Sequence, residues 1–302
     1  MPAQYVIGID LGTTNSVLAY SSLHNEHPLV QLLPLPQLTA PNSIESLPML
    51  PSFLYLCTAE ETTAETFAMP GSDDASFVAG HAARKLSAEF PDRTIGAAKS
   101  WLGHSKIDRH QAILPWQAAS DVTKISPVMA SQRYLEHIVA AWHDAFPDAP
   151  LVEQHVVLTV PASFDASARE LTREAALAAG LPHLFVLLEE PQAATYAWLD
   201  AIGDRWRKLL KVGDRMLVCD IGGGTTDLTL VEVAEEDGEL TLQRAAVGNH
   251  LLVGGDNMDL ALAHHVAQLF EEKGTSLDPW QSVSLWHSCR NAKESLLSDE
   301  GP

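Results

Sequence analysis

Two segments of the chain each place an aspartate directly before a turn rich in glycine and threonine. Asp10 ends an apolar run and precedes the turn 11–15, and Asp220 stands in the same position before the turn 221–226. Backbone N–H groups in such turns can bind phosphate oxygens, because glycine has no Cβ to obstruct the approach. An aspartate next to phosphate is favourable only with a divalent cation between them, and Mg²⁺ is typically held by one or two carboxylates plus phosphate. The two turns therefore predict a site for phosphate and Mg²⁺.

Each turn also has a simpler interpretation as a tight β-hairpin. Apolar runs flank both turns, and short glycine motifs match by chance. A hairpin alone, however, needs only glycine or asparagine for its positive φ values, whereas these turns add hydroxyl donors at Thr13, Thr14 and Thr225. Because the acid has the same offset in both segments, we interpret them as one phosphate-binding device that occurs twice.

The composition is that of an acidic globular protein. The chain has 302 residues, 46% of them hydrophobic, and its 19 Lys and Arg against 39 Asp and Glu give a formal charge of -20. Such a surface repels phosphate backbones and anionic lipid, so we expect no nucleic-acid partner and no membrane partner. Cys57, Cys219 and Cys289 are far apart and suggest neither disulfides nor a zinc site. With no leader-like segment before the first strand, the sequence predicts a soluble cytoplasmic protein.

Strands and helices alternate along the chain, which indicates an α/β architecture. Apolar runs predict strands at 52–57, 156–160 and 184–188. Helical spacing and end signals predict helices at 131–146, 165–180 and 191–203, the second capped by Asp165. The proline-rich stretch 28–51 predicts a connection without regular structure, and the acidic stretch 58–74 a surface loop or hairpin. The repeated hairpin unit indicates two related lobes, with the basic stretch 204–215 as the passage between them.

Several segments together resemble one family of proteins. GIDLGTTNS at 8–16 and DIGGGTTD at 220–227 resemble the two phosphate motifs of the actin-like ATPases, which include actin, sugar kinases and the DnaK-type heat-shock protein 70 chaperones. Three further segments are similar to the chaperones in particular: VPASFDASARELTREAALAAGL at 160–181, EEPQAATYAWL at 189–199 and GHAARKLSAEFPDRTIGAAKSWLG at 80–103. The resemblance covers nearly the whole chain.

The resemblance implies an α/β actin-like ATPase (ribonuclease H-like) duplicated fold, with two lobes around a nucleotide cleft. Lobe I would comprise residues 1–203, with a peripheral subdomain at about 40–125, and residues 216–302 would form a partial lobe II after the passage 204–215. The sequence ends inside the expected second lobe. We therefore expect a fragment of a longer protein rather than a naturally truncated paralogue.

The resemblance also implies roles for individual residues. Asp10 and Asp220 would organise Mg²⁺ through water, while Glu190 and Asp227 would hold metal-bound or attacking water. The predicted phosphate and nucleotide contacts are Gly12, Thr13, Thr14, Asn15, Gly222, Gly223, Gly224, Thr225 and Lys293. The predicted catalytic residues are Arg84, Glu190, Asp220, Thr225 and Asp227. Pro161 and Arg169 would couple nucleotide state to a peptide-binding domain, although without the family they are interpreted as a strand terminator and a solvated helix residue.

Two departures from the family pattern affect the expected chemistry. Arg84, with Lys85 beside it, stands where the family has a lysine that touches the γ-phosphate and the lytic water, so hydrolysis is expected to be slower or differently aligned. In the predicted adenosine-binding helix, Arg290 replaces a ribose-binding glutamate. Glu294 and Leu297 stand where a cation and a serine are common, so nucleoside affinity or base preference is expected to differ.

The leading hypothesis is the nucleotide-binding portion of a DnaK-type chaperone. It would bind and hydrolyse ATP with Mg²⁺, release ADP, and act with a J-domain co-chaperone, a nucleotide-exchange factor and unfolded client proteins bound by another domain. Phosphoryl transfer fits the residues, because it depends mostly on positioning and charge stabilisation. Two alternatives remain. A sugar kinase of the same superfamily would form ADP only when sugar is present. A nucleotide-sensing interaction or filament protein with weak turnover would pellet in centrifugation when ATP is added.

Overall fold

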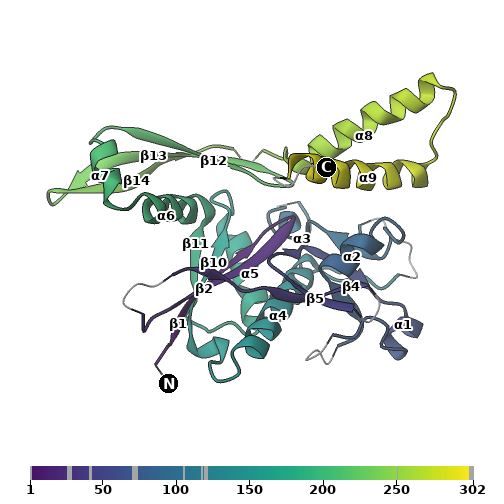
Figure 1. Cartoon of the computed structure of the whole chain (residues 1–302), viewed down its shortest axis with the longest axis horizontal. Helices are drawn as coiled ribbons and strands as arrows, with labels where there is room; N and C mark the ends of the chain where they lie inside the picture. The colour runs from purple at the N-terminus through teal and green to yellow at the C-terminus, as the bar shows by residue number, and fades with distance from the viewer. Residues whose placement is uncertain are drawn as a thin grey trace.

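The computed structural model describes residues 2–25, 29–40, 43–69, 74–104, 106–116, 118, 122–249 and 251–298. Within these ranges the chain is mixed α/β, as predicted (Figure 1). Figure 1 shows the strands β12–β14 and the helices α8 and α9 along one side of the N-terminal part, with α6 next to the strands. Among the described residues, no helix is both long and apolar enough to cross a lipid bilayer.

The first predicted hairpin lies in the largest sheet. The strands of this sheet are β1 (Tyr5–Leu11), β2 (Asn15–Ser22), β3 (Gln31–Leu32), β6 (Leu50–Pro51), β10 (His155–Val160) and β11 (Val186–Glu189). β1 pairs antiparallel with β2 and parallel with β10, and β10 pairs parallel with β11. Ile7, Ile9 and Leu11 are buried, because alternate residues of β1 face the core. The alternation places Asp10 on the other face, at the end of the strand.

Two long helices pack together beside this sheet. Helix α4 (Pro127–Ala145) begins at the cap Ser126, whose hydroxyl accepts the N–H of Met129, and it buries Ile138 and Trp142 in the main core. Helix α5 (Ala166–Ala178) begins at Asp165, whose carboxylate accepts the N–H of Ala168 at 2.7 Å. The two predicted helices and the cap are therefore confirmed.

A peripheral group of short elements lies between β3 and α4 in the chain. It contains the hairpin β4 (Leu35–Ala40) and β5 (Ser43–Leu47), the sheet of β7 (Phe53–Leu56), β8 (Phe77–Ala79) and β9 (Thr94–Gly96), and the helices α1 (Ala59–Thr63), α2 (His81–Leu86) and α3 (Ala98–Leu102). Leu38, Tyr55 and Val78 belong to a small core of its own. Helix α2 packs against β7 of this group, whereas α3 packs against α4 and α5; these two helices carry the two cations considered below.

The second predicted hairpin lies in the C-terminal part. Helix α6 (Glu190–Ile202) is followed by a 3₁₀ turn (Gly203–Arg205), α7 (Trp206–Leu209), β12 (Arg215–Ile221), β13 (Thr226–Glu236), β14 (Glu239–Val247), α8 (Gly255–Glu272) and α9 (Pro279–Leu297). β13 pairs antiparallel with both β12 and β14, and Asp220 stands opposite Asp227. Both hairpins are therefore confirmed, and each has its aspartate just before the turn.

Two predictions for connecting segments are wrong. The stretch 28–51 contains β3 to β6 instead of an irregular connection; a two-stranded hairpin such as β4–β5 has only edge strands, which tolerate proline. The stretch 58–74 begins with helix α1, because Thr58 and Glu61 form a reciprocal capping box; residues 70–73 lie outside the described residues. The stretch 204–215 contains the short helix α7, and its place as the passage between two lobes stays a prediction.

Candidate phosphate site

The two glycine-threonine turns face one another in the structure. A Cβ atom added to Gly223 would lie 1.6 Å from the hydroxyl oxygen of Thr14, and one added to Gly224 would lie 3.3 Å from the methyl group of Thr13. Glycine is therefore required at position 223, because any side chain would collide with the opposite turn. Hairpins more than 200 residues apart in sequence thus meet at one place.

A cavity of about 590 Å³ lies between the turns. It collects most of the predicted site residues: Asp10, Gly12, Thr13, Thr14, Asn15, Pro161, Glu190, Asp220, Gly222, Gly223 and Thr225. The cavity is also lined by residues that the sequence analysis did not select, among them Lys99, Ser100 and Thr159. The Thr14 hydroxyl is buried and has no hydrogen-bond partner among the described residues. A buried hydroxyl without a partner is costly, so a ligand that accepts its hydrogen bond would be favoured here.

Three carboxylates at this cavity influence one another. Burial raises the pKa of Glu190, the first residue of α6, and Asp10 and Asp220 add to the rise, while Lys99 partly opposes it. Burial also raises the pKa of Asp220, again against the effect of Lys99. Asp10 accepts a hydrogen bond from the Thr159 hydroxyl at 2.7 Å, which orients its carboxylate. Acids held together in this way favour a cation between them.

Asp227 and Gly224 were also predicted in the site. Asp227 is buried on β13 opposite Asp220, and it does not line the cavity. Gly224 contributes backbone at the turn without lining the cavity. Among the described residues, no cluster of three or more His, Cys, Asp or Glu side chains is arranged to bind a metal ion.

The cavity contains one basic side chain that the sequence analysis missed. Lys99, on α3, is the only Lys or Arg among the described residues that line the cavity, and its side chain is only 9% exposed. Its ammonium group donates to the carboxylate of Glu190. The signal for it was present in the segment 80–103, but sequence spacing alone does not show which cation points toward the turns.

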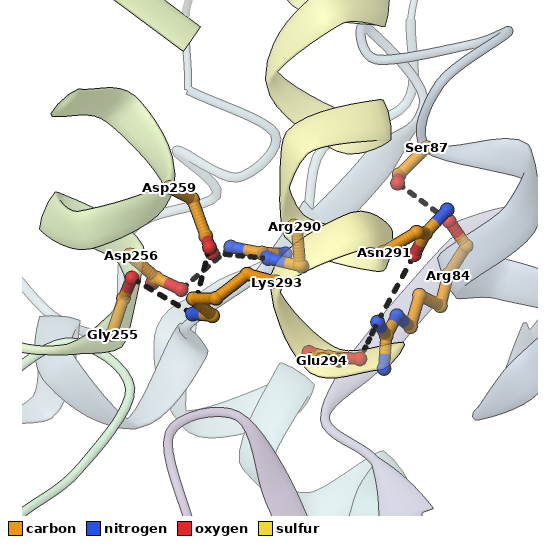
Figure 2. Close-up of polar contacts among 9 residues, drawn as sticks. All are labelled: Arg84, Ser87, Gly255, Asp256, Asp259, Arg290, Asn291, Lys293 and Glu294. Carbon is orange, nitrogen blue, oxygen red and sulfur yellow. Dashed lines mark hydrogen bonds and ion pairs between the residues drawn. The ribbon is translucent and has the colours of Figure 1, made fainter. Parts of the chain in front are cut away.

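The structure does not bring Arg84 to this cavity, contrary to its predicted role at the γ-phosphate. Arg84 lies on α2, and its guanidinium donates to Glu294 at 2.5 Å and to Asn291 at 3.4 Å, both on α9 (Figure 2). The ion pair with Glu294 holds the arginine against α9, and Arg84 does not line the cavity between the turns. Arg84 thus links the peripheral group to the last helix.

Lys293 and Arg290 belong to an ion network between α8 and α9 (Figure 2). Arg290 is buried and donates to Asp259 at 3.0 Å and to Asp256 at 2.5 Å. Lys293 lies 2.7 Å from the other oxygen of Asp259 and donates to the backbone oxygen of Gly255. A second cavity of about 520 Å³, lined in part by Thr14, Asp256 and Arg290, adjoins this network. The predicted contact of Lys293 with a nucleotide stays a prediction.

A glycine pair before α8 supports the second turn and was also missed. The N–H of Gly255 donates to the oxygen of Gly222 at 3.0 Å, and the N–H of Asp256 donates to that of Gly223 at 2.7 Å. A Cβ on Gly254 would lie 2.5 Å from both of these oxygens, so only glycine permits the approach. The available signal was a Gly-Gly-Asp sequence directly before a helical pattern.

The two predicted coupling residues lie next to the site. Pro161 follows β10 and lines the cavity. Arg169 donates to the backbone oxygen of Phe164 at 3.0 Å and to Glu189 at 2.7 Å, so its interpretation as a solvated helix residue is wrong. Glu189 also accepts from Arg244 of β14. Burial would raise the pKa of Glu189, but the two arginines outweigh it and the pKa is lowered.

Comparison with known protein families agrees with the geometry. The family model described as Hsp70 protein matches residues 69–300, well over half of the chain. The second turn and both predicted coupling residues lie inside this range, whereas the first turn precedes it. The chain belongs to the Hsp70 family of ATP-binding chaperone proteins.

Proposed function

We propose that this chain is the nucleotide-binding portion of a DnaK-type chaperone and that it binds and hydrolyses ATP with Mg²⁺. The observation that carries the proposal is the meeting of the two hairpin turns at one cavity with Asp10, Glu190 and Asp220. Membership of the Hsp70 family favours this function over a sugar kinase or a filament protein. The proposal includes an actin-like duplicated fold, with lobe I at 1–203 and lobe II beginning at 216.

The chain's own groups suit a polyphosphate. Backbone N–H groups of the two turns and the hydroxyls of Thr13, Thr14 and Thr225 would donate to phosphate oxygens. The buried, unpartnered hydroxyl of Thr14 is the clearest sign of a missing acceptor among the described residues. Glu190 would position and accept a proton from the attacking water, since its carboxylate faces the cavity.

The donor set also fits Mg²⁺ held through water. Asp10 and Asp220 come from the two hairpins, and the described residues offer no direct cluster of ligands. Mg²⁺ commonly keeps several waters and uses one or two carboxylates plus phosphate. When bound, it would neutralise phosphate charge next to the three acids.

Two further features belong to the proposal. Pro161 at the cavity and Arg169 at Glu189 would pass nucleotide state to a client-binding domain, with a J-domain co-chaperone and an exchange factor as partners. The three cysteines of the chain are free thiols, which is compatible with a cytoplasmic location.

Calorimetric titration tests the proposal. The chain is titrated with ATP and with ADP in the presence of Mg²⁺, with EDTA in a parallel experiment, and ATP hydrolysis is followed by phosphate release. We expect binding that requires Mg²⁺ and is lost in Asp10→Ala and Thr225→Ala. Asp148→Asn is the matched control, because Asp148 is an exposed acid that is distant in sequence from both turns. Undiminished binding and hydrolysis in both site variants would refute the assigned roles.

A further inference from the structure

We propose that Lys99, and not Arg84, is the side-chain cation that binds the phosphate groups of a ligand held between the two turns. This inference rests on the proposed function, because it assigns a contact within the same site. In the structure the Lys99 ammonium donates to Glu190 at the cavity. A bound polyphosphate would share or take over this ammonium.

The position of Lys99 is determined by the packing of its helix. Its neighbours Ala98 and Leu102, four residues apart on α3, are both fully buried. They anchor this short helix in the core, and Lys99 extends from it to the cavity. The next residue, Ser100, also lines the cavity. The side chain of Lys99 is 9% exposed, so its charge acts in a poorly solvated environment.

The charge balance of the cavity requires such a cation. Asp10, Glu190 and Asp220 line it, and among the described lining residues no other Lys or Arg opposes them. A polyphosphate adds further negative charge to this surface. An ammonium group has three N–H donors, and the structure gives Lys99 one side-chain hydrogen-bond partner among the described residues. Lys99 therefore keeps donors for phosphate oxygens even while it contacts Glu190.

The cations of α2 are directed elsewhere. Arg84 donates to Glu294 and Asn291 of α9. Lys85 donates to the backbone oxygen of Thr39 at 2.8 Å, on β4. Neither lines the cavity between the turns. Arg84 and Lys85, which the sequence places at the expected phosphate contact, therefore bind α9 and β4. The cation at the cavity comes from α3.

The test compares lysine and arginine variants of the full chain. Lys99→Met, Arg84→Met and the exposed control Lys106→Met are titrated calorimetrically with tripolyphosphate and with ATP, both in Mg²⁺. Loss of a charged hydrogen bond to phosphate should weaken binding of both ligands about 10- to 100-fold in Lys99→Met. Arg84→Met and Lys106→Met should stay within about 2-fold of the unmodified chain, since neither side chain lines the cavity.

A second variant distinguishes loss of the phosphate contact from loss of the fold. Lys99→Gln removes the charge but can still donate to Glu190, so it should keep the circular dichroism spectrum and thermal midpoint while losing affinity for both ligands. A folded Lys99→Gln with unchanged affinity, or the loss appearing in Arg84→Met instead, would overturn the inference alone. If the unmodified chain binds neither tripolyphosphate nor ATP, the proposed function fails together with it.

Discussion

Replacing Gly254 by alanine should separate helix α8 from the second glycine-threonine turn. The new Cβ would lie 2.5 Å from the backbone oxygens of Gly222 and Gly223, which cannot rotate away as a side chain can. The helix and the turn would therefore have to move apart by about 0.5 Å or more. That movement stretches the hydrogen bonds from Gly255 to Gly222 and from Asp256 to Gly223, now 3.0 and 2.7 Å long.

The expected cost follows from these two effects. Forcing a methyl group into a packed contact costs about 1–3 kcal/mol, and each backbone hydrogen bond contributes about 0.5–1.5 kcal/mol. The two costs are not fully additive, because the movement that relieves the clash is the movement that stretches the hydrogen bonds. We therefore expect the free energy of unfolding to fall by about 2–4 kcal/mol. Affinity for MgATP should fall as well, since the displaced turn carries the amides proposed to bind phosphate.

Urea unfolding followed by circular dichroism measures the stability, and calorimetry measures the affinity. The matched control is Gly8→Ala, because a Cβ on Gly8 meets no atom within 4 Å. At that position alanine should be neutral or slightly stabilising, by less than about 1 kcal/mol. If Gly254→Ala matched Gly8→Ala in both measurements, the assigned contact between α8 and the turn would be refuted.

Three further predictions concern charged groups. Asp259→Asn should lower the free energy of unfolding by about 3–5 kcal/mol in urea titrations, because it leaves two cations beside a buried amide. Glu294→Gln, at an exposed ion pair, should lower it by less than about 1 kcal/mol. The lowered pKa of Glu189 stabilises the fold above pH 4.5, its unfolded-state pKa, and this stabilisation is lost as the pH falls further. The free energy of unfolding should therefore fall less steeply with decreasing pH in Glu189→Gln. Burial lowers the pKa of His137 from its ordinary value of 6.5, so the free energy of unfolding should fall as the pH drops below that value. The fall should be smaller in His137→Gln, which keeps the neighbouring Arg133 and Glu136.

Local signals account for the parts of the fold that the sequence predicts well. Asp165 caps α5 through an N–H only three residues away, and each hairpin turn joins strands that are adjacent in the chain. Such contacts depend on neighbouring residues, so spacing and residue type suffice to infer them. The segments 28–51 and 58–74 were harder because an edge strand tolerates proline and a capping box can start a short helix in an acidic stretch.

Contacts between distant segments account for most of what the sequence did not reveal. Glu189 joins Arg169, which is 20 residues away, with Arg244, which is 55 residues away. Gly254 is required only because the turn at Gly222 packs against it. No periodic pattern signals such requirements, since they arise from how separate elements meet. The tertiary structure is needed to find them.

The cations of the segment 80–103 show why position in a sequence motif does not establish which side chain reaches a cavity. A helix of a few residues presents its side chains in all directions, so the direction of each depends on which positions are buried. On α2 the buried residues are Ala82 and Ala83, and Arg84 points to the acid on α9. On α3 the buried Ala98 and Leu102 leave Lys99 facing the acids between the turns. Electrostatics favours the same arrangement, because Arg84 pairs with Glu294 and Lys99 pairs with Glu190. Burial and charge therefore identify Lys99, and not Arg84, as the cation proposed to bind phosphate, whereas position in the motif does not.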